Sequence, residues 1–237
     1  MPHVIPGRRS VAEALRAGRR LRKIHLERTE GALGVIAEAA REAGVPVRSA
    51  TRDELDELTG GVRHQGAVGI AEAFSYASLE QVGDSDLLVV LDGVTDPQNL
   101  GAIARSAEAA GAGGLVISRR RSAHVTPAAE RAAAGAFSWL PVAEVPNIAR
   151  ALADLAERGV WSVGLDADGP PLWDCELLDG KVAVVLGAEG KGLSRLVAER
   201  VDALASIPMP GRLASLNVSA AAAVALFEVV RRRSLND

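Results

Sequence analysis

The sequence predicts an α/β protein in which a small N-terminal α/β unit precedes a larger domain with a parallel sheet. Strands alternate with helices along the chain, as is typical of a parallel sheet covered on both faces. Two apolar runs, residues 87–91 and 182–186, each end in an abrupt Gly-, Pro- or Asn-rich turn that opens a helical pattern. The polar segment 73–85 lacks a sustained period, which suits a linker. The domains are therefore expected at residues 1–72 and 86–237.

The first unit is expected to contain three helices and three strands, because apolar residues recur there first at helical spacing and then in short runs. In chain order these are a helix at 10–17, a strand at 23–27, a helix at 33–43, a strand at 45–48, a helix at 53–58 and a strand at 67–71.

The larger domain repeats the pattern of an apolar run, a turn and a helical period. Its expected elements are a strand at 87–91, a helix at 101–110, a strand at 114–117, a helix at 127–135, a strand near 140–142, a helix at 147–158, strands at 161–165 and 182–186, a helix at 194–199, a strand at 203–207 and a last helix at 216–232.

Composition limits the class of protein. A chain of 237 residues that is 48% hydrophobic and 24% charged can bury a real core. The longest apolar stretch, residues 220–227, is too short to span a membrane, and the N-terminus lacks an apolar signal core, so we expect a cytoplasmic location. Cys175 is the only cysteine, and the four histidines lack ligand-like spacing, so neither a disulfide nor a metal site is expected.

Positive charge gathers near the N-terminus. Residues 1–72 hold 12 Lys and Arg against 10 Asp and Glu, a net charge of +2, whereas the rest of the chain has a net charge of −5. Within residues 8–23, Glu13 is the only acid among seven basic side chains, which favours a phosphate-rich partner such as RNA. A solvated helix face is the alternative. The basic residues are Arg8, Arg9, Arg16, Arg19, Arg20, Arg22 and Lys23.

Common nucleotide and hydrolase motifs are absent from the sequence. Residues 111–116 precede a strand and lack the last glycine of a dinucleotide fingerprint, and residues 187–193 lack the spacing of a P-loop. No Gly-x-Ser-x-Gly elbow is present. Conventional hydrolysis is therefore disfavoured.

Three polar segments interrupt the apolar pattern of the larger domain, at residues 96–101, 187–192 and 215–219. Burying polar groups costs free energy unless each finds a partner. The first two follow predicted strands, and ligands bind beyond the carboxyl ends of strands in open α/β sheets. These loops are the candidate site.

The same segments resemble three ordered motifs of the SpoU family of RNA ribose 2′-O-methyltransferases, in the trefoil-knotted SPOUT class. The motifs match residues 91–107, 185–193 and 207–219. Residues 7–15 and 62–66 are similar to the L30e-like RNA-binding domain of members that methylate a guanosine of 23S rRNA. The resemblance implies a knotted catalytic domain, S-adenosylmethionine as cofactor, an RNA partner and a homodimer.

The resemblance also implies which residues hold the cofactor. Glycines allow close approach of backbone to a ligand. The alternative is that the glycines only end a strand and that Leu216 is helix core. The implied cofactor residues are Leu186, Gly187, Gly190, Ile207, Met209, Leu216 and Ser219, with Glu189 beside them.

Arg105 is the implied centre of catalysis, either as a base or as a clamp on a substrate phosphate. A guanidinium is hard to deprotonate, so the clamp is physically easier. Asn99 would place the ribose or cap a helix, and Glu189 would orient Arg105 or bind substrate. Ser215 and Asn217 would lie near the ribose and the cofactor carboxylate, although Asn217 could instead cap the last helix.

The implied RNA-binding residues are Arg8, Arg9, Arg19, Arg20, Arg22, Lys23 and His64. Two residues depart from the family pattern: Ser138 replaces an acid in a Gly-Ala-Ala-Glu run, and Pro6 replaces histidine or tyrosine. We expect ribose methylation of a guanosine in 23S rRNA. The alternatives are another rRNA or tRNA nucleotide, including the antibiotic-resistance type, a non-catalytic RNA-binding ribosome-assembly factor, or a nucleotide hydrolase.

Overall fold

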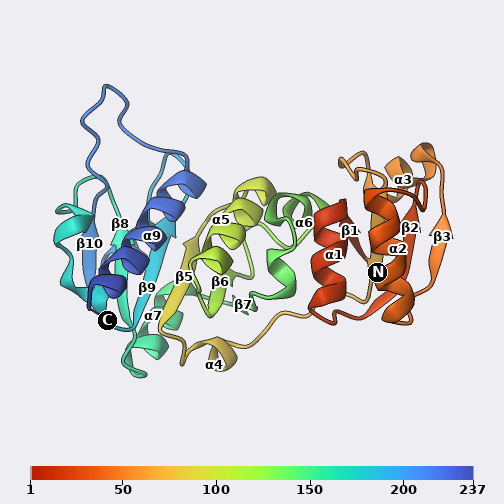
Figure 1. Ribbon diagram of the computed structural model, residues 1–237. Coiled ribbons are helices and arrows are strands. Elements are labelled where there is room, and N and C mark those ends of the chain that lie inside the picture. Colours follow the sequence, from red (N-terminus) through yellow and green to blue (C-terminus); the bar gives the residue numbers. More distant parts are fainter. Residues whose placement is uncertain (1, 237) are drawn as a thin grey trace.

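The computed structural model describes residues 2–236, which form two α/β units joined by a segment along one side of the molecule (Figure 1). The smaller unit has a four-stranded sheet in the order β1-β4-β2-β3, in which β4 is antiparallel to β1 and β2. Strand β3 is parallel to β2. The elements of this unit are β1 (His3–Pro6), α1 (Arg8–Arg16), β2 (Leu21–Leu26), α2 (Ala32–Glu42), β3 (Val47–Ser49), α3 (Arg52–Thr59) and β4 (Ala67–Ala71).

The larger unit contains a six-stranded sheet in the order β10-β8-β9-β5-β6-β7, and every pair is parallel. This confirms the parallel sheet predicted from the sequence. The strands are β5 (Leu87–Asp92), β6 (Gly114–Ser118), β7 (Val142–Val145), β8 (Trp161–Leu165), β9 (Val182–Gly187) and β10 (Ala203–Ala205). The trefoil knot stays a prediction.

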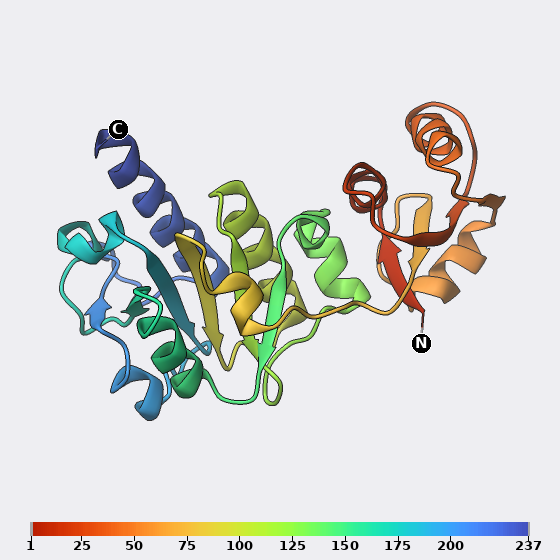
Figure 2. The same cartoon turned by 90° about the horizontal axis from the view of Figure 1, so that it is seen from below.

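Helices cover both faces of this sheet, with α5, α6 and α9 on one face and α7 and α8 on the other (Figure 2). The central strand β5 is buried on both sides, because Val89 and Leu91 pack in the first layer while Leu88 and Val90 pack in the second. Each such side chain contributes about 1.5–3 kcal/mol of burial free energy. The helices are α4 (Leu79–Val82), α5 (Pro97–Ala109), α6 (Pro127–Ala133), α7 (Ile148–Ala156), α8 (Arg195–Ala198) and α9 (Val218–Asn236), with short 3₁₀ turns at Ala136–Ser138, Leu172–Asp174 and Glu176–Asp179.

Two of the helix starts that differ from the sequence prediction are defined by side-chain caps. Helix α5 begins at Pro97 and not at residue 101, since the Asp96 carboxylate accepts a hydrogen bond from the Gln98 N–H at 2.8 Å and proline is well suited to a first turn. Helix α9 begins at Val218, so Leu216 precedes the helix. The strand β1 was not predicted, because four residues ending in proline carry no periodic signal.

The segment 73–85 packs closely on the larger unit. Ala77 pairs with Ala143 beside β7, and the Tyr76 hydroxyl accepts a hydrogen bond from the Val125 N–H at 3.1 Å. Residues 79–82 form α4. No helix in the range 2–236 is long and apolar enough to cross a membrane.

A fully buried carboxylate joins the two units. Glu130 of α6 accepts hydrogen bonds from Arg19 Nη1 and His3 Nε2, both at 2.7 Å. The Ser10 hydroxyl donates to the Glu130 carbonyl at 3.3 Å. A buried charge is tolerated only when it is paired and hydrogen-bonded. Glu130 therefore fixes α1 and β1 against α6.

Replacing Glu130 with glutamine should lower the free energy of unfolding by about 3 kcal/mol, because Arg19 would keep a charge without its carboxylate partner. Urea unfolding measures this difference. The matched control is Glu38→Gln, which removes a surface ion pair with Arg41 and should cost less than about 1 kcal/mol. Equal losses for both variants would contradict a structural role for the buried carboxylate.

Candidate active site

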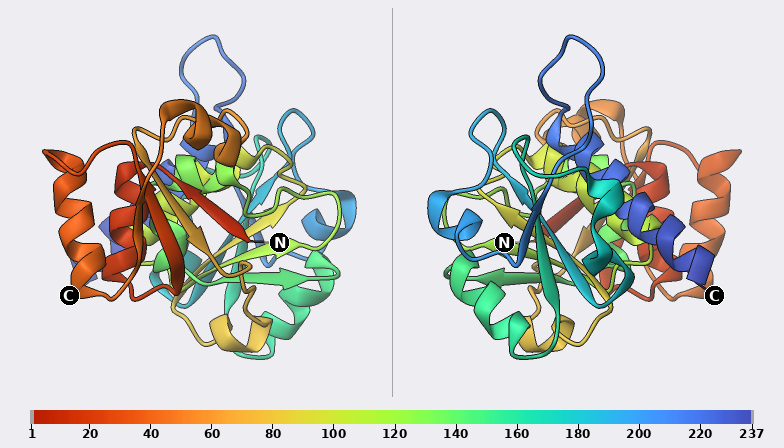
Figure 3. Two further views of the ribbon diagram at one scale, coloured as in Figure 1. Left: turned by 90° about the vertical axis from the view of Figure 1, so that its right-hand side faces the viewer. Right: turned by 90° about the vertical axis from the view of Figure 1, so that its left-hand side faces the viewer.

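The loops after the strands of the larger sheet leave the same edge, since all six strands are parallel. Figure 3 shows the loop after β9 and the long loop after β10 projecting from one end of the molecule. A cavity of about 610 Å³ lies between them, within the range typical of small-ligand sites. The predicted residues that line it are Leu186, Gly187, Glu189, Gly190, Ile207, Met209, Ser215, Leu216 and Asn217.

The cavity also has walls that the sequence did not indicate. The end of β8 contributes Leu165, the loop after it contributes Asp166 and Ala167, and Ala221 of α9 also lines the cavity. The carboxyl end of β8 belongs to the same sheet edge as the motif loops, and that placement could have drawn attention to Asp166. The remaining lining residues are Ala188, Gly192, Ala205, Ala214 and Val218.

Gly187 is required by the path of the backbone. A Cβ atom at this position would overlap with the backbone of Gly192 and with the Leu193 nitrogen. The loop closes on itself there, because the Ala188 N–H donates to the Gly192 carbonyl and the Gly192 N–H donates to the Ala188 carbonyl, both at 2.9 Å. Gly190 and Gly192 adopt φ angles of 70° and 65°, which favour glycine. Gly187 therefore does more than end a strand.

Three polar side chains from three distant segments meet beside this loop. Asn99 of α5 donates through Nδ2 to Glu189 Oε1, and Asn217 Nδ2 donates to the same oxygen at 3.2 Å. Asn217 Nδ2 also donates to Asn99 Oδ1 at 3.1 Å. Asn99 is only 7% exposed, so its amide needs these partners. One carboxylate oxygen thus joins the three predicted motifs.

Asn217 serves two purposes in this arrangement. Its Oδ1 accepts from the Ser219 N–H at 2.8 Å and from the Ser219 hydroxyl at 2.6 Å, at the start of α9. The amide group therefore caps the helix while its nitrogen holds Asn99 and Glu189. Ser219 supports Asn217 and is not among the lining residues of the cavity. Leu216 lines the cavity and is 40% exposed, which excludes the alternative of helix core.

Arg105 lies apart from this cluster. It is six residues after Asn99 on α5, about 240° around the helix axis, so the two side chains leave different faces. Arg105 is exposed, and within residues 2–236 its guanidinium has neither a hydrogen bond nor an ion pair. The structure thus shows no contact of Arg105 with Asn99 or Glu189.

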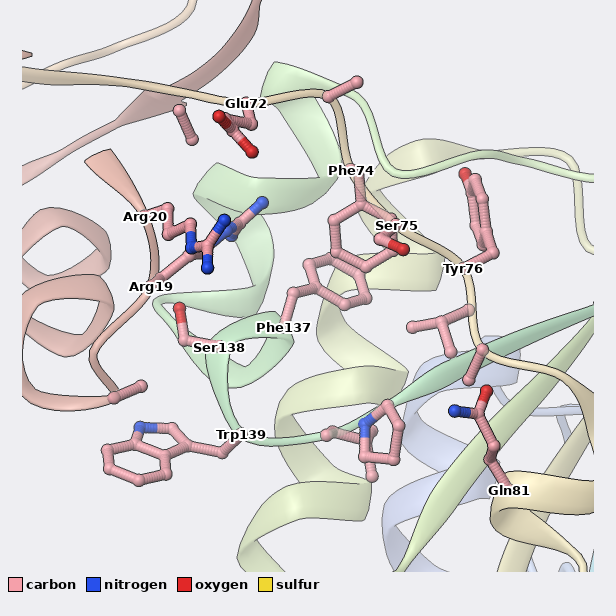
Figure 4. Close-up of a pocket in the computed structure, with 17 residues that line it drawn as sticks. Arg19, Arg20, Glu72, Phe74, Ser75, Tyr76, Gln81, Phe137, Ser138 and Trp139 are labelled. Atoms are coloured by element: carbon pink, nitrogen blue, oxygen red, sulfur yellow. The ribbon is translucent and has the colours of Figure 1, made fainter. Parts of the chain in front are cut away.

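Four of the seven predicted RNA-binding residues line two cavities. Arg8 and His64 line a cavity of about 610 Å³ on the smaller unit. Arg19 and Arg20 line another of about 470 Å³ at the junction of the units, where both guanidinium groups point toward Phe74 (Figure 4). Arg9 and Arg22 are exposed elsewhere, and Lys23 is half-buried on β2. The sequence did not indicate three further arginines of the first cavity, Arg28, Arg52 and Arg63.

The His64 side chain is buried and contacts neighbouring residues of its own unit. It is only 5% exposed, its Nδ1 accepts from the Gly66 N–H at 3.0 Å, and its Nε2 lies 3.2 Å from Asp56 Oδ1. The two departures from the family pattern lie near the junction of the units. Ser138 lines the cavity of Arg19, and its buried hydroxyl has no hydrogen-bond partner in the described part of the chain, while Pro6 ends β1.

Residues 2–236 contain no cluster of His, Cys, Asp and Glu that could hold a metal ion.

The parallel sheet, the glycine-closed cavity at its carboxyl edge and the appended unit define a two-domain α/β protein with a small-ligand site at the end of its larger sheet. Residues 86–227 match the model of the SpoU rRNA Methylase family, and residues 4–77 match the model for RNA 2′-O ribose methyltransferase substrate binding. The chain belongs to the SpoU rRNA methylase family and is therefore an S-adenosylmethionine-dependent RNA 2′-O-methyltransferase.

Relatives and solved structures agree with this assignment. The chain is 46% identical to the 23S rRNA (guanosine-2′-O-)-methyltransferase RlmB of Xylella fastidiosa, over 84% of this chain and 83% of the relative. It is 43% identical to an uncharacterized tRNA/rRNA methyltransferase of Mycobacterium ulcerans, over 96% of this chain and 76% of the relative.

Among solved structures, the SpoU methyltransferase AviRb of Streptomyces viridochromogenes superimposes with a TM-score of 0.85 at 27% identity, covering 99% of this chain and 91% of that chain. Its complex with AdoMet gives a TM-score of 0.81 at 26% identity, with coverages of 98% and 91%. These comparisons confirm the predicted SPOUT fold class and cofactor.

Proposed function

We propose that the protein transfers the methyl group of S-adenosylmethionine to the ribose 2′-oxygen of a guanosine in 23S rRNA. The observation that carries the proposal is the cluster of Asn99, Glu189 and Asn217 at the mouth of a glycine-closed cavity. The likeness to RlmB supports the guanosine target. Since the substrate is ribosomal RNA, the protein would act in the cytoplasm.

The residues of the cavity fit the cofactor. Gly187 and Gly190 let backbone groups approach a ligand closely, and Leu186, Ile207 and Leu216 offer apolar walls for an adenine ring. Two carboxylates at the cavity, those of Glu189 and Asp166, would favour the sulfonium cation of the donor. Met209 and Ser215 complete the cavity wall, and Ser219 acts through Asn217.

When bound, S-adenosylmethionine would supply a methyl group on a sulfonium, which leaves as a neutral thioether when the C–S bond breaks, so the protein chiefly aligns the hydroxyl and accepts its proton. Asn99 and Asn217 hold Glu189 through one of its oxygens. The other oxygen is left to accept a hydrogen bond from the ribose. Arg105, with a free guanidinium, would clamp the neighbouring phosphate through two parallel N–H donors.

The N-terminal unit would bind the RNA outside the target nucleotide. Arg8, Arg28, Arg52 and Arg63 surround one cavity, where a phosphate would find several guanidinium groups. The other predicted residues, Arg9, Arg19, Arg20, Arg22, Lys23 and His64, would contribute charge or shape nearby. A homodimer is part of the proposal, since α9 exposes Val224 and Phe227 to 36% and 49%, beside a run of small alanines.

The test is transfer of labelled methyl groups to 23S rRNA, 16S rRNA and tRNA transcripts, with the modified ribose mapped by primer extension. We expect label on one guanosine of 23S rRNA, and loss of that mark in cells without the gene. Label on another rRNA nucleotide or on tRNA would support those alternatives. Cofactor binding without transfer to any RNA would contradict the proposal.

A further inference from the structure

The loop between β6 and α6 carries three consecutive arginines at the same sheet edge as the active site. Arg119, Arg120 and Arg121 directly follow Ser118, the last residue of β6. Strand β6 lies next to β5, whose own loop leads to Asn99. The two loops are joined, because the Ala123 N–H donates to the Val94 carbonyl at 2.8 Å.

The backbone of this loop has a defined shape. The Ser118 hydroxyl donates to the Arg120 carbonyl at 2.8 Å and accepts from the Arg120 N–H at 3.3 Å. Arg121 has a φ of 58°, in the left-handed region that non-glycine residues rarely adopt. Such a conformation costs about 1–3 kcal/mol and persists only where the surroundings determine it. The turn therefore places these side chains reproducibly at the surface.

The Glu144 carboxylate neutralises Arg119, but no carboxylate in the described residues pairs with Arg120 or Arg121. Glu144 of β7 accepts from Arg119 Nε at 3.0 Å, and its other oxygen lies 3.3 Å from His124 Nδ1. Arg120 and Arg121 are exposed, and within residues 2–236 neither forms an ion pair.

The other carboxylates of this edge already have hydrogen-bond donors. Asp92 accepts from the Ser194 N–H, Asp96 caps α5, and Glu189 holds the two asparagines. The sheet edge beside the active site therefore presents two unneutralised guanidinium groups.

We propose that Arg120 and Arg121 bind phosphates of the RNA strand that flanks the target nucleotide. This inference rests on the proposed function. A guanidinium fork matches the oxygens of a phosphate. The loop does not line any of the cavities described above, so its open surface fits an extended polyanion better than a small anion.

The position of the loop relative to Arg105 supports the same partner. Helix α5, which carries Arg105, packs tightly on α6, which the arginine loop enters: a Cβ atom on Gly101 would overlap with the Ala129 carbonyl of α6. Arg105 is exposed on α5 and also lacks an ion pair in the described structure. The arginine loop and Arg105 therefore belong to two elements that pack directly against each other.

The test is the double variant Arg120→Gln, Arg121→Gln, assayed for binding of a 23S rRNA fragment at several salt concentrations and for transfer kinetics. We expect the slope of log affinity against log salt to fall by about 1.4, since each phosphate contact contributes about 0.7 on single strands. KM for RNA should rise about tenfold, while kcat and the affinity for S-adenosylmethionine stay unchanged.

Three controls keep the result interpretable. Arg200→Gln removes one exposed charge just before β10, at the opposite sheet edge, and should leave the slope and KM unchanged. Arg121→Gly keeps the left-handed backbone but loses the charge, and should show part of the defect. Arg121→Lys keeps the charge and should restore most of the salt slope.

A double variant with the wild-type slope and KM would overturn the inference, as would an equal defect in Arg200→Gln. If the double variant misfolds, the comparison of Arg121→Gly with Arg121→Lys decides instead. The proposed function fails separately, when the wild-type protein methylates no RNA. In that event the salt slope of RNA binding still shows whether this loop contacts phosphates.

Discussion

Replacing Arg105 with alanine should reduce methyl transfer by about a thousandfold, the upper end of the loss caused by removing one donor that stabilises the transition state. The affinity for S-adenosylmethionine should stay within about twofold of the wild-type value, because Arg105 does not line the cofactor cavity. The guanidinium is exposed and has no partner within residues 2–236, so its removal costs the fold little. Single-turnover transfer and calorimetry with the cofactor measure the two effects.

Two further variants sharpen the interpretation of Arg105. Arg105→Lys keeps the charge but loses the two-pronged donor, so a phosphate clamp predicts partial activity. Arg150→Ala removes another exposed arginine, from the first turn of α7 on the other face of the sheet, and should retain full transfer. Full activity of Arg105→Ala would remove this residue from the mechanism.

Replacing Gly187 with valine should weaken S-adenosylmethionine binding by about a hundredfold or more. Any Cβ atom at this position overlaps with the backbone of Gly192, so the loop must open. Strain of about 3 kcal/mol, at the upper end of the usual cost of overpacking, corresponds to about a hundredfold in affinity. Calorimetric titration measures the loss, and circular dichroism checks that the domain remains folded.

The matched control is Gly211→Ala in the neighbouring loop, where an added Cβ meets no atom within 4 Å. This variant should bind the cofactor with the wild-type affinity. Equal affinities for Gly187→Val and Gly211→Ala would show that the cofactor does not depend on the closed shape of the β9 loop.

Much of the larger domain could be predicted from the sequence because its central strands are buried on both faces. Such strands appear as continuous apolar runs, as at residues 87–91 and 182–186. Boundaries were harder where a side chain defines them: the Pro97 start of α5 depends on the Asp96 cap. Strand β1 depends on its pairing with β4, more than 60 residues away in sequence.

In the candidate site too, some features could be predicted from the sequence and others could not. The motif loops follow strands whose carboxyl ends must share one edge, so their meeting could be predicted. Asp166 was missed, because its loop carries no motif and only the position of β8 in the sheet brings it to the cavity.

Charge runs are also poor guides to a surface. Arg8 and Arg19 are near in sequence, yet Arg8 begins α1, a helix about 14 Å long, whereas Arg19 follows its C-terminal end, and the two line different cavities. Burial of Glu130 could not be foreseen either, since its partners are more than 100 residues distant in the chain.

In the proposed mechanism, the single oxygen of Glu189 that Asn99 and Asn217 share would link binding of the methyl donor to binding of the RNA. Glu189 belongs to the glycine loop that closes the cavity, whereas Asn99 belongs to the helix that carries Arg105. A ligand that stabilises one orientation of the Glu189 carboxylate would therefore favour both the cavity loop and the start of α5 in their binding geometry. Each substrate should then raise the affinity of the other by the same factor, so the order in which they arrive is of no thermodynamic consequence.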